Sequence, residues 1–231
     1  MLYSLIRGMF SGQNITFWDL MVGLFSAFFV IFVTMPVHEW AHAFTAYKLG
    51  DPTAKYNGRL TLNPMAHIHW LGAVLVLLFG FGYAKPVPVN QRNFKHPKWG
   101  MALTALAGPL SNFVMGFICY LLQATAYYFA IVYVSKTLAY VAVFFSYAGL
   151  INLYLAAFNL IPIPPLDGSR ILFAVLPDRI YYRIQAYERY IYLIVIFLAA
   201  FGLLSGPTQW IADKLYSFCA FIINSLFNLI L

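Results

Sequence analysis

Four long segments of the chain contain no charged residue: Leu20–Val37, Met101–Ser135, Thr137–Leu166 and Tyr190–Ala212. A helix of about 20 apolar residues crosses the hydrocarbon core of a bilayer, so segments of this length can span a membrane. Over the whole chain, 62% of the residues are hydrophobic and only 9% are charged. Soluble domains carry about 25% charged residues, which is far more than this chain has to cover a surface in water. We therefore predict an all-α polytopic membrane protein and exclude a soluble one.

The apolar pattern predicts about five transmembrane helices. The first helix ends near Gly50, because Asp51-Pro52 follows as a stop signal. The prolines at positions 162, 164 and 165 do not allow the third helix to continue regularly. The predicted helices cover about Phe17–Leu49, Met101–Val134, Thr137–Leu160, Arg189–Leu204 and Gln209–Leu231.

Three shorter segments lie between the first two predicted helices. Trp70–Tyr83 is apolar but too short to span a bilayer, and glycines interrupt it, so we predict a re-entrant hairpin. The Asn57-Gly58 pair is typical of the turn of a small β-hairpin. Lys85–Val89 contains two prolines, which disfavour a helix, and we expect it to be extended.

Basic residues gather in particular connections between the apolar segments. Lys and Arg are enriched in cytoplasmic loops, so we place the basic loops inside the cell. Both ends of Trp70–Tyr83 then face the same side, which agrees with a re-entrant hairpin. The net charge of +7 is explained in this way without a nucleic-acid partner. The basic loop residues are Lys48, Lys55, Arg59, Lys85, Arg92, Lys95, Lys98, Arg170, Arg179, Arg183 and Arg189.

The first predicted helix ends in the pattern H-E-x-x-H, formed by His38, Glu39 and His42. Residues four apart lie on one helical face, so both imidazoles can bind one metal ion, and Glu39 can act as general base on water. The alternative is a chance match on a solvated helix surface. However, the motif directly continues an uncharged run, where burying three polar side chains without partners costs several kcal/mol. The sequence therefore favours a zinc site.

A catalytic zinc site needs a third protein ligand and an open position for water. Asp167 directly follows the uncharged run and a proline-rich stretch, whereas most other acidic residues lie at segment ends or in loops. If both segments end on the inner side, Asp167 reaches the depth of His38 and His42. Alternatively, Asp167 caps a helix that begins near Ser169, and the spacing leaves this open.

Several motifs together resemble the site-2 protease family of intramembrane zinc metalloproteases. The similarity covers about residues 37–176 and is typical of the short bacterial and archaeal members. The three motifs of the catalytic core occur in the order of the family. The matching segments are His38–His42, Gly58–Pro64, Ala84–Asn90, Gly108–Asn112 and Asn159–Gly168.

The resemblance implies one Zn²⁺ per chain, with Asp167 as the third ligand beside His38 and His42. It implies that Asn159 holds the substrate carbonyl or the developing oxyanion, and that Asn112 has a supporting role on a neighbouring helix. It further implies a single membrane-embedded peptidase domain over residues 1–231, with a catalytic core at about 17–176 and C-terminal helices at about 189–231. The expected substrate is a transmembrane protein, cleaved within or near its membrane segment in regulated intramembrane proteolysis.

One stretch departs from the family pattern, because His69-Trp70 stands where similar sequences have Asp-Pro. His67 and His69 are either polar residues of the membrane interface or ligands of a second metal.

The sequence predicts a multi-pass protein of the cell membrane, with the active site towards the cytoplasm. A non-enzymatic transporter or metal-binding membrane protein is the alternative, but it would not require Glu39 between two histidines. The sequence does not indicate the oligomeric state.

Overall fold

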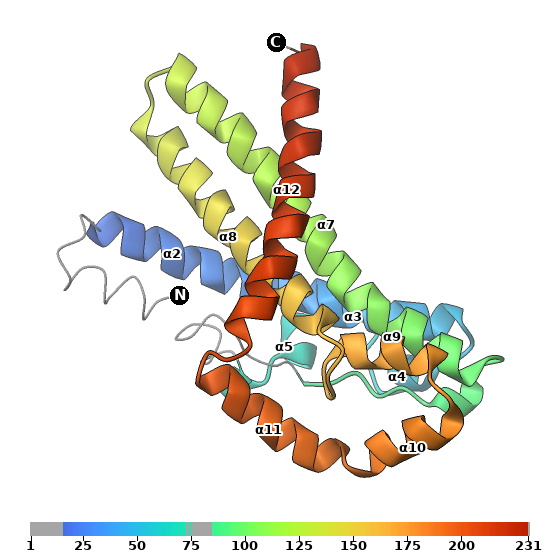
Figure 1. Ribbon diagram of the computed structural model, residues 1–231. Helices are drawn as coiled ribbons and strands as arrows, with labels where there is room; N and C mark the ends of the chain where they lie inside the picture. The colour runs from blue at the N-terminus through green and yellow to red at the C-terminus, as the bar shows by residue number, and fades with distance from the viewer. Residues whose placement is uncertain (1–15, 73, 75–84, 231) are drawn as a thin grey trace.

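The computed structural model describes residues 16–72, 74 and 85–230, and it contains helices but no strand within these ranges. Figure 1 shows long helices above a layer of short ones. The long elements are α2 (Phe17–Phe29), η1 (Val30–Thr34), α3 (Met35–Lys48), α7 (Pro97–Val132), α8 (Lys136–Leu160) and α12 (Ser205–Ile230). The shorter ones are α4 (Thr53–Tyr56), α5 (Pro64–His67), η2 (Gln91–Asn93), α9 (Asp167–Val175), α10 (Asp178–Ala186) and α11 (Glu188–Ala200).

The elements α2, η1 and α3 form one continuous helical rod, which confirms the first predicted helix to within one residue. The Thr16 hydroxyl and the Asp19 carboxylate cap its start reciprocally. Five residues of the rod, Val30–Thr34, have π-helical geometry, and the Met35 N–H bonds the Val30 carbonyl. This wide turn ends two residues before Pro36, which has no N–H to donate, so the irregularity accompanies the proline.

Helices α7 and α8 form a long antiparallel pair joined by a short turn (Figure 1). Small residues allow the close approach: Gly116 faces the Leu153 side chain, and Gly149 faces the Tyr120 ring. Both predicted helices are confirmed, although α7 begins four residues earlier than expected, at Pro97. Proline suits the first turn of a helix, where no N–H partner is required.

Three helical segments are long and apolar enough to cross a bilayer: Phe17–Lys48, Pro97–Val132 and Lys136–Leu160. The predicted number of about five spans is therefore not confirmed in the described part of the chain. Helix α11 has 13 residues, which gives about 20 Å of helix, shorter than a hydrocarbon core of about 30 Å. Helix α12 is long enough, but it carries Asp213 and Lys214.

The predicted β-hairpin at Asn57-Gly58 is not found, because this pair ends helix α4 instead. Gly58 has a φ of +67°, its N–H bonds the Lys55 carbonyl, and the Arg59 N–H bonds the Ala54 carbonyl. These two bonds form a Schellman motif, in which a left-handed glycine closes a helix. Gly58 is left-handed here, as the glycine of a hairpin turn would be, so the local signal for a turn was correct and its context was wrong.

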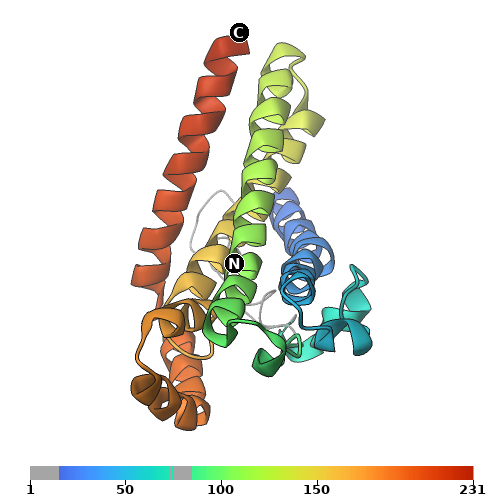
Figure 2. The same cartoon turned by 90° about the vertical axis from the view of Figure 1, so that its right-hand side faces the viewer.

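The predicted re-entrant hairpin at Trp70–Tyr83 lies mostly outside the described residues and stays a prediction. The segment that follows, Lys85–Asn90, has no regular secondary structure, as expected for its prolines. Helices α9, α10 and α11 gather at the end of the α7–α8 pair where α7 begins and α8 ends (Figures 1 and 2).

Candidate metal centre

Three predicted ligands lie together although they come from distant parts of the chain. His38 and His42 are buried on α3, and Asp167 is the first residue of α9. The two Nε2 atoms are 3.0 Å apart. The Asp167 Oδ2 atom lies 3.5 Å from Nε2 of His38 and 3.3 Å from Nε2 of His42. In the described part of the chain, this is the one group of three such side chains with ligand geometry.

The His42 ring is oriented by the backbone of α7. Its Nδ1 atom lies 2.7 Å from the Thr104 carbonyl oxygen, which only accepts hydrogen bonds. Nδ1 therefore carries the proton, and the lone pair of Nε2 is directed towards His38 and Asp167. This arrangement is typical of a metal-binding histidine, whose second nitrogen donates to a carbonyl or a carboxylate.

Gly108 of α7 lies directly against both histidine rings. A Cβ atom at this position would be 2.3 Å from the His42 Nε2 atom and 2.6 Å from the His38 Cε1 atom. No side chain fits there without displacing the rings. The absence of a side chain at position 108 is therefore a condition for the geometry of the site.

The position of Asp167 depends on how α9 begins. Gly168 faces the backbone carbonyls of Leu160 and Ile161, where a Cβ atom would be only 2.3 Å from the Leu160 oxygen. This close approach holds the start of α9 against the end of α8. Asp167 is already inside the helix, and the N-cap residue is Leu166, which makes no side-chain cap. The capping alternative for Asp167 therefore does not apply.

Two imidazole nitrogens and one carboxylate oxygen form a donor set that suits zinc. Ligand atoms at 2.0–2.2 Å from a tetrahedral ion are about 3.3–3.6 Å apart. The observed separations of 3.0, 3.5 and 3.3 Å are close to this range. The three residues therefore fit a zinc ion and leave the fourth position open for water or substrate.

The other predicted site residues lie on the same helices or close to them. Glu39 is buried beside His38 on α3. Asn159 is half-buried at the end of α8 and donates one amide N–H to the Leu155 carbonyl at 3.0 Å. Asn112 is buried on α7, one turn after Gly108, and its Oδ1 atom has no hydrogen-bond partner among the described residues. The structure does not assign a chemical role to these three side chains.

His67 and His69 are the two residues that could bind a second metal or lie as polar residues at the membrane interface. His67 is buried, and its Nε2 atom lies 2.7 Å from the Thr61 carbonyl oxygen. Hence this nitrogen already has a backbone partner. His67 and His69 belong to no three-residue ligand group in the described ranges.

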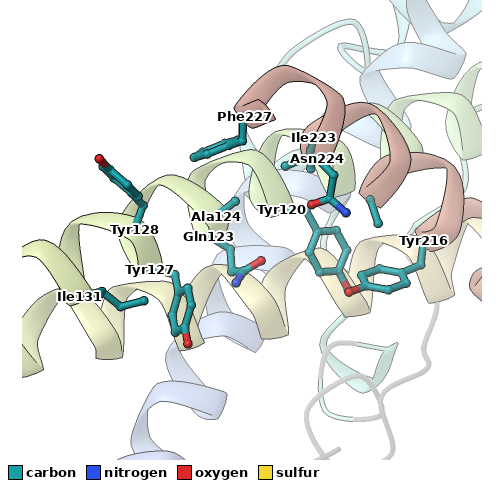
Figure 3. Close-up of a pocket in the computed structure, with 11 residues that line it drawn as sticks. Tyr120, Gln123, Ala124, Tyr127, Tyr128, Ile131, Tyr216, Ile223, Asn224 and Phe227 are labelled. Atoms are coloured by element: carbon teal, nitrogen blue, oxygen red, sulfur yellow. The ribbon is translucent and has the colours of Figure 1, made fainter. Parts of the chain in front are cut away.

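A cavity of about 400 Å³ lies between the C-terminal halves of α7 and α12, and it is separate from the His38, His42 and Asp167 group. Figure 3 shows Tyr120, Gln123 and Tyr127 on α7 and Tyr216 and Asn224 on α12 lining it. Tyr120 is about 18 Å along α7 from Gly108. The cavity contains none of the predicted ligands, so the candidate site is the metal centre.

The chain is similar to a peptidase family and to individual proteins with related names. A model of peptidase family M50 matches residues 125–202, which include Asn159 and Asp167. Three relatives are named as proposed zinc metalloproteases. YwhC of Bacillus subtilis (strain 168) is 40% identical over 174 residues, which cover 74% of this chain and 80% of YwhC. Rip2 of Mycolicibacterium smegmatis is 27% identical over 82% of this chain and 71% of Rip2. MJ0611 of Methanocaldococcus jannaschii is 32% identical over 58% of this chain and 62% of MJ0611. No solved structure matches the chain.

Proposed function

Since this chain belongs to peptidase family M50 and is a membrane zinc metalloprotease, we propose that it cleaves transmembrane proteins within or near their membrane segments. Such cleavage is the reaction of regulated intramembrane proteolysis. The observation that carries the proposal is the convergence of His38, His42 and Asp167 at a buried point of a helix long enough to span the bilayer.

We assign the three converging side chains as the zinc ligands. Bound zinc lowers the pKa of water towards neutrality and polarises a carbonyl group. The Thr104 carbonyl supports this role, because it keeps the Nε2 lone pair of His42 free for a ligand. Gly108 supports it by leaving space for both rings.

Glu39 is the general base of the proposed reaction. It directly follows His38 on α3, so its carboxylate projects beside the helical face that carries the two histidine ligands. Glu39 accepts the proton of the attacking water and then donates it to the leaving amine. Asn159 retains one amide N–H after its bond to Leu155, and this donor is available for the developing oxyanion.

A transmembrane helix hides its amides in its own hydrogen bonds, so a substrate must unwind before water can attack. We propose that the unwound segment adds as a strand to Lys85–Asn90. Within this segment only Val87 and Val89 have N–H donors without a partner in the described part of the chain, because Pro86 and Pro88 have none. In extended backbone, residues two apart direct their N–H groups to the same edge. The segment therefore offers one edge for pairing.

We place the site towards the cytoplasmic face of a multi-pass cell-membrane protein. Exposed aromatic side chains mark both ends of α7, at Trp99 and at Tyr128–Tyr133. Trp99 and Tyr128 are about 43 Å apart along the helix, which matches a bilayer with its interfaces. Gly108, beside the histidines, is about 13 Å from Trp99. The site is therefore nearer the basic end of α7 than its midpoint, which shortens the path that water must take to the zinc.

Glu39→Gln in purified full-length protein tests the function. We expect the variant to retain about one zinc per chain and to lose cleavage of a model transmembrane substrate by about 100-fold or more. Retained zinc with retained cleavage would refute the assignment of Glu39. Absence of cleavage by zinc-loaded wild-type protein, tested on several transmembrane substrates, would support the transporter or metal-binding alternative instead.

A further inference from the structure

Arg59 is a buried cation, with 6% of its surface exposed, in the connection after α4. It forms no ion pair in the described ranges. Instead, its guanidinium donates hydrogen bonds to three backbone carbonyls, those of Ala66, Lys85 and Pro86, with a distance of 3.0 Å to Pro86. Burying a charge without a carboxylate partner is costly, so a buried guanidinium bound only to backbone requires an explanation.

The three carbonyls belong to two separate segments. Ala66 is part of α5, whereas Lys85 and Pro86 begin the extended segment Lys85–Asn90. The Lys85 N–H also bonds the His67 carbonyl at 2.8 Å. Arg59 thus ties the start of the extended segment to α5. A planar guanidinium with five donors can hold several carbonyls at once, which an ammonium group cannot do in the same geometry.

The other end of the extended segment is held by Asp51. This carboxylate is fully buried and accepts the Asn90 N–H at 2.7 Å and the Asn93 amide at 2.6 Å. Asp51 itself is bound to α3, because its N–H donates to the Ala46 carbonyl at 2.9 Å. Both anchors therefore come from the stretch that directly follows the helix with His38 and His42. Between them, Val87 and Val89 keep their backbone groups unpaired in the described part of the chain.

Arg59 is also electrostatically coupled to the candidate site. Burial lowers the pKa of the Arg59 guanidinium, and the nearby Glu39 carboxylate opposes this shift. The charge of Glu39 therefore acts on the residue that holds Lys85 and Pro86. Arg59 therefore lies within electrostatic range of Glu39.

We propose that Arg59 is a positioning residue that sets the register of the extended segment Lys85–Asn90 relative to Glu39. The inference rests on the proposed function, because it assumes that a substrate strand pairs with this segment. If the segment is held at one register, one peptide bond of the paired substrate is presented to Glu39. If the anchor is loosened, the segment and the paired substrate shift, and neighbouring bonds are presented as well. Misplacement by about 1 Å can cost up to about 100-fold in rate.

The test compares Arg59→Gln and Arg59→Lys with the wild-type protein. Gln cannot reach three carbonyls, and Lys keeps the charge without the planar fork. Arg92→Gln is the matched control, because Arg92 is exposed, lies next to the extended segment and undergoes the same substitution. Zinc content, the thermal unfolding midpoint, KM, kcat and the positions of cleavage by mass spectrometry are measured on full-length protein with one transmembrane substrate.

We expect Arg59→Gln to retain zinc, to lower kcat by about tenfold or more, and to spread cleavage over neighbouring bonds. Arg59→Lys should show a smaller effect of the same kind, and Arg92→Gln should behave as wild type. Unchanged kcat and a single cleavage position in both Arg59 variants would overturn the inference. Loss of zinc or of folding in both variants would also overturn it, since the role would then be structural. Failure of the wild-type protein to cleave would instead refute the proposed function.

Discussion

At the scale of single residues, the metal centre depends on a backbone position that carries no functional group. Gly108 brings α7 so close to α3 that an added Cβ would overlap the His42 ring at 2.3 Å. The neighbouring Thr104 carbonyl orients the same ring. Both contributions come from backbone rather than from a side chain with its own chemistry.

Gly108→Ala should therefore disturb the site without changing any proposed ligand. We expect zinc affinity to fall by about 10- to 100-fold, as for loss of groups that orient metal ligands, and proteolysis to fall with it. Zinc titration of the purified protein measures the effect. Gly206→Ala is the control, since a Cβ atom there meets nothing within 4 Å. Equal zinc affinity in the two variants would contradict this account.

The sequence predicted His38, Glu39, His42 and Asp167 as a group, and the structure brings the three proposed ligands together. It did not predict the contact of Gly108 with the rings or the role of Thr104. A carbonyl oxygen is present in every residue, so no residue type identifies it. The His42–Thr104 pair also joins positions 62 residues apart, which only the packing of two helices determines.

The ionisation of the buried Asp51 carboxylate contributes to the stability of the fold. Four hydrogen bonds, from the backbone and side chains of Thr53, Asn90 and Asn93, lower its pKa below 3.8, although burial alone raises it. The ionised carboxylate therefore stabilises the fold above pH 3.8, and this contribution is lost as the pH falls through the lowered pKa.

Asp51→Asn should reduce the free energy of unfolding by about 2 kcal/mol at pH 7, because charged hydrogen bonds become neutral ones. The difference between variant and wild type should shrink below pH 3.8. Thermal unfolding in detergent between pH 7 and pH 3 measures this difference. A gap that stays constant over this range would disagree with the stated cause.

At the scale of elements, long apolar helices were predicted well and short polar elements poorly. The limits of α2–α3 and α8 agree with the prediction to within one residue, because charge, Gly and Pro mark their ends. Lys55-Tyr56, which precedes the predicted hairpin turn at Asn57-Gly58, is the end of the helical turn α4. The flanking residues Arg59 and Asp51 form hydrogen bonds with Lys85 and Asn90, 26 and 39 residues along the chain, and a local sequence pattern does not contain these contacts.

The proposed docking edge gives a prediction for one element, Lys85–Asn90. Val87→Pro removes a backbone N–H, whereas Val87→Ala removes only side-chain atoms. We expect Val87→Pro to lower kcat/KM for a transmembrane substrate by about tenfold, the value of one hydrogen bond, while zinc content is unchanged. Val87→Ala should lose much less. Equal kcat/KM in the two variants would argue against strand pairing at this residue.

At the scale of the whole molecule, the proposed membrane orientation rests on the basic loops and the aromatic ends of α7. The wild-type cysteines, Cys119 and Cys219, are both buried. We therefore expect a maleimide to label an introduced, exposed cysteine and not these two. Tyr56 is 82% exposed on the proposed inner side, and Thr137 is exposed at the opposite end of the α7–α8 pair.

A membrane-impermeant maleimide applied to intact cells should label Thr137→Cys and leave Tyr56→Cys unlabelled. After permeabilisation, Tyr56→Cys should be labelled too. The reverse pattern would place the metal centre on the outer side and contradict the positive-inside orientation.

The zinc content of Asp167→Ala, measured by elemental analysis of purified protein, tests whether His38, His42 and Asp167 form the metal site. Asp167 joins α9 to the two histidines, so we predict about one zinc per wild-type chain and loss of most of it in the variant. Asp213→Ala, which removes an exposed acid on α12, should retain the wild-type zinc content. Full zinc occupancy in Asp167→Ala would show that the three converging side chains are not the metal site.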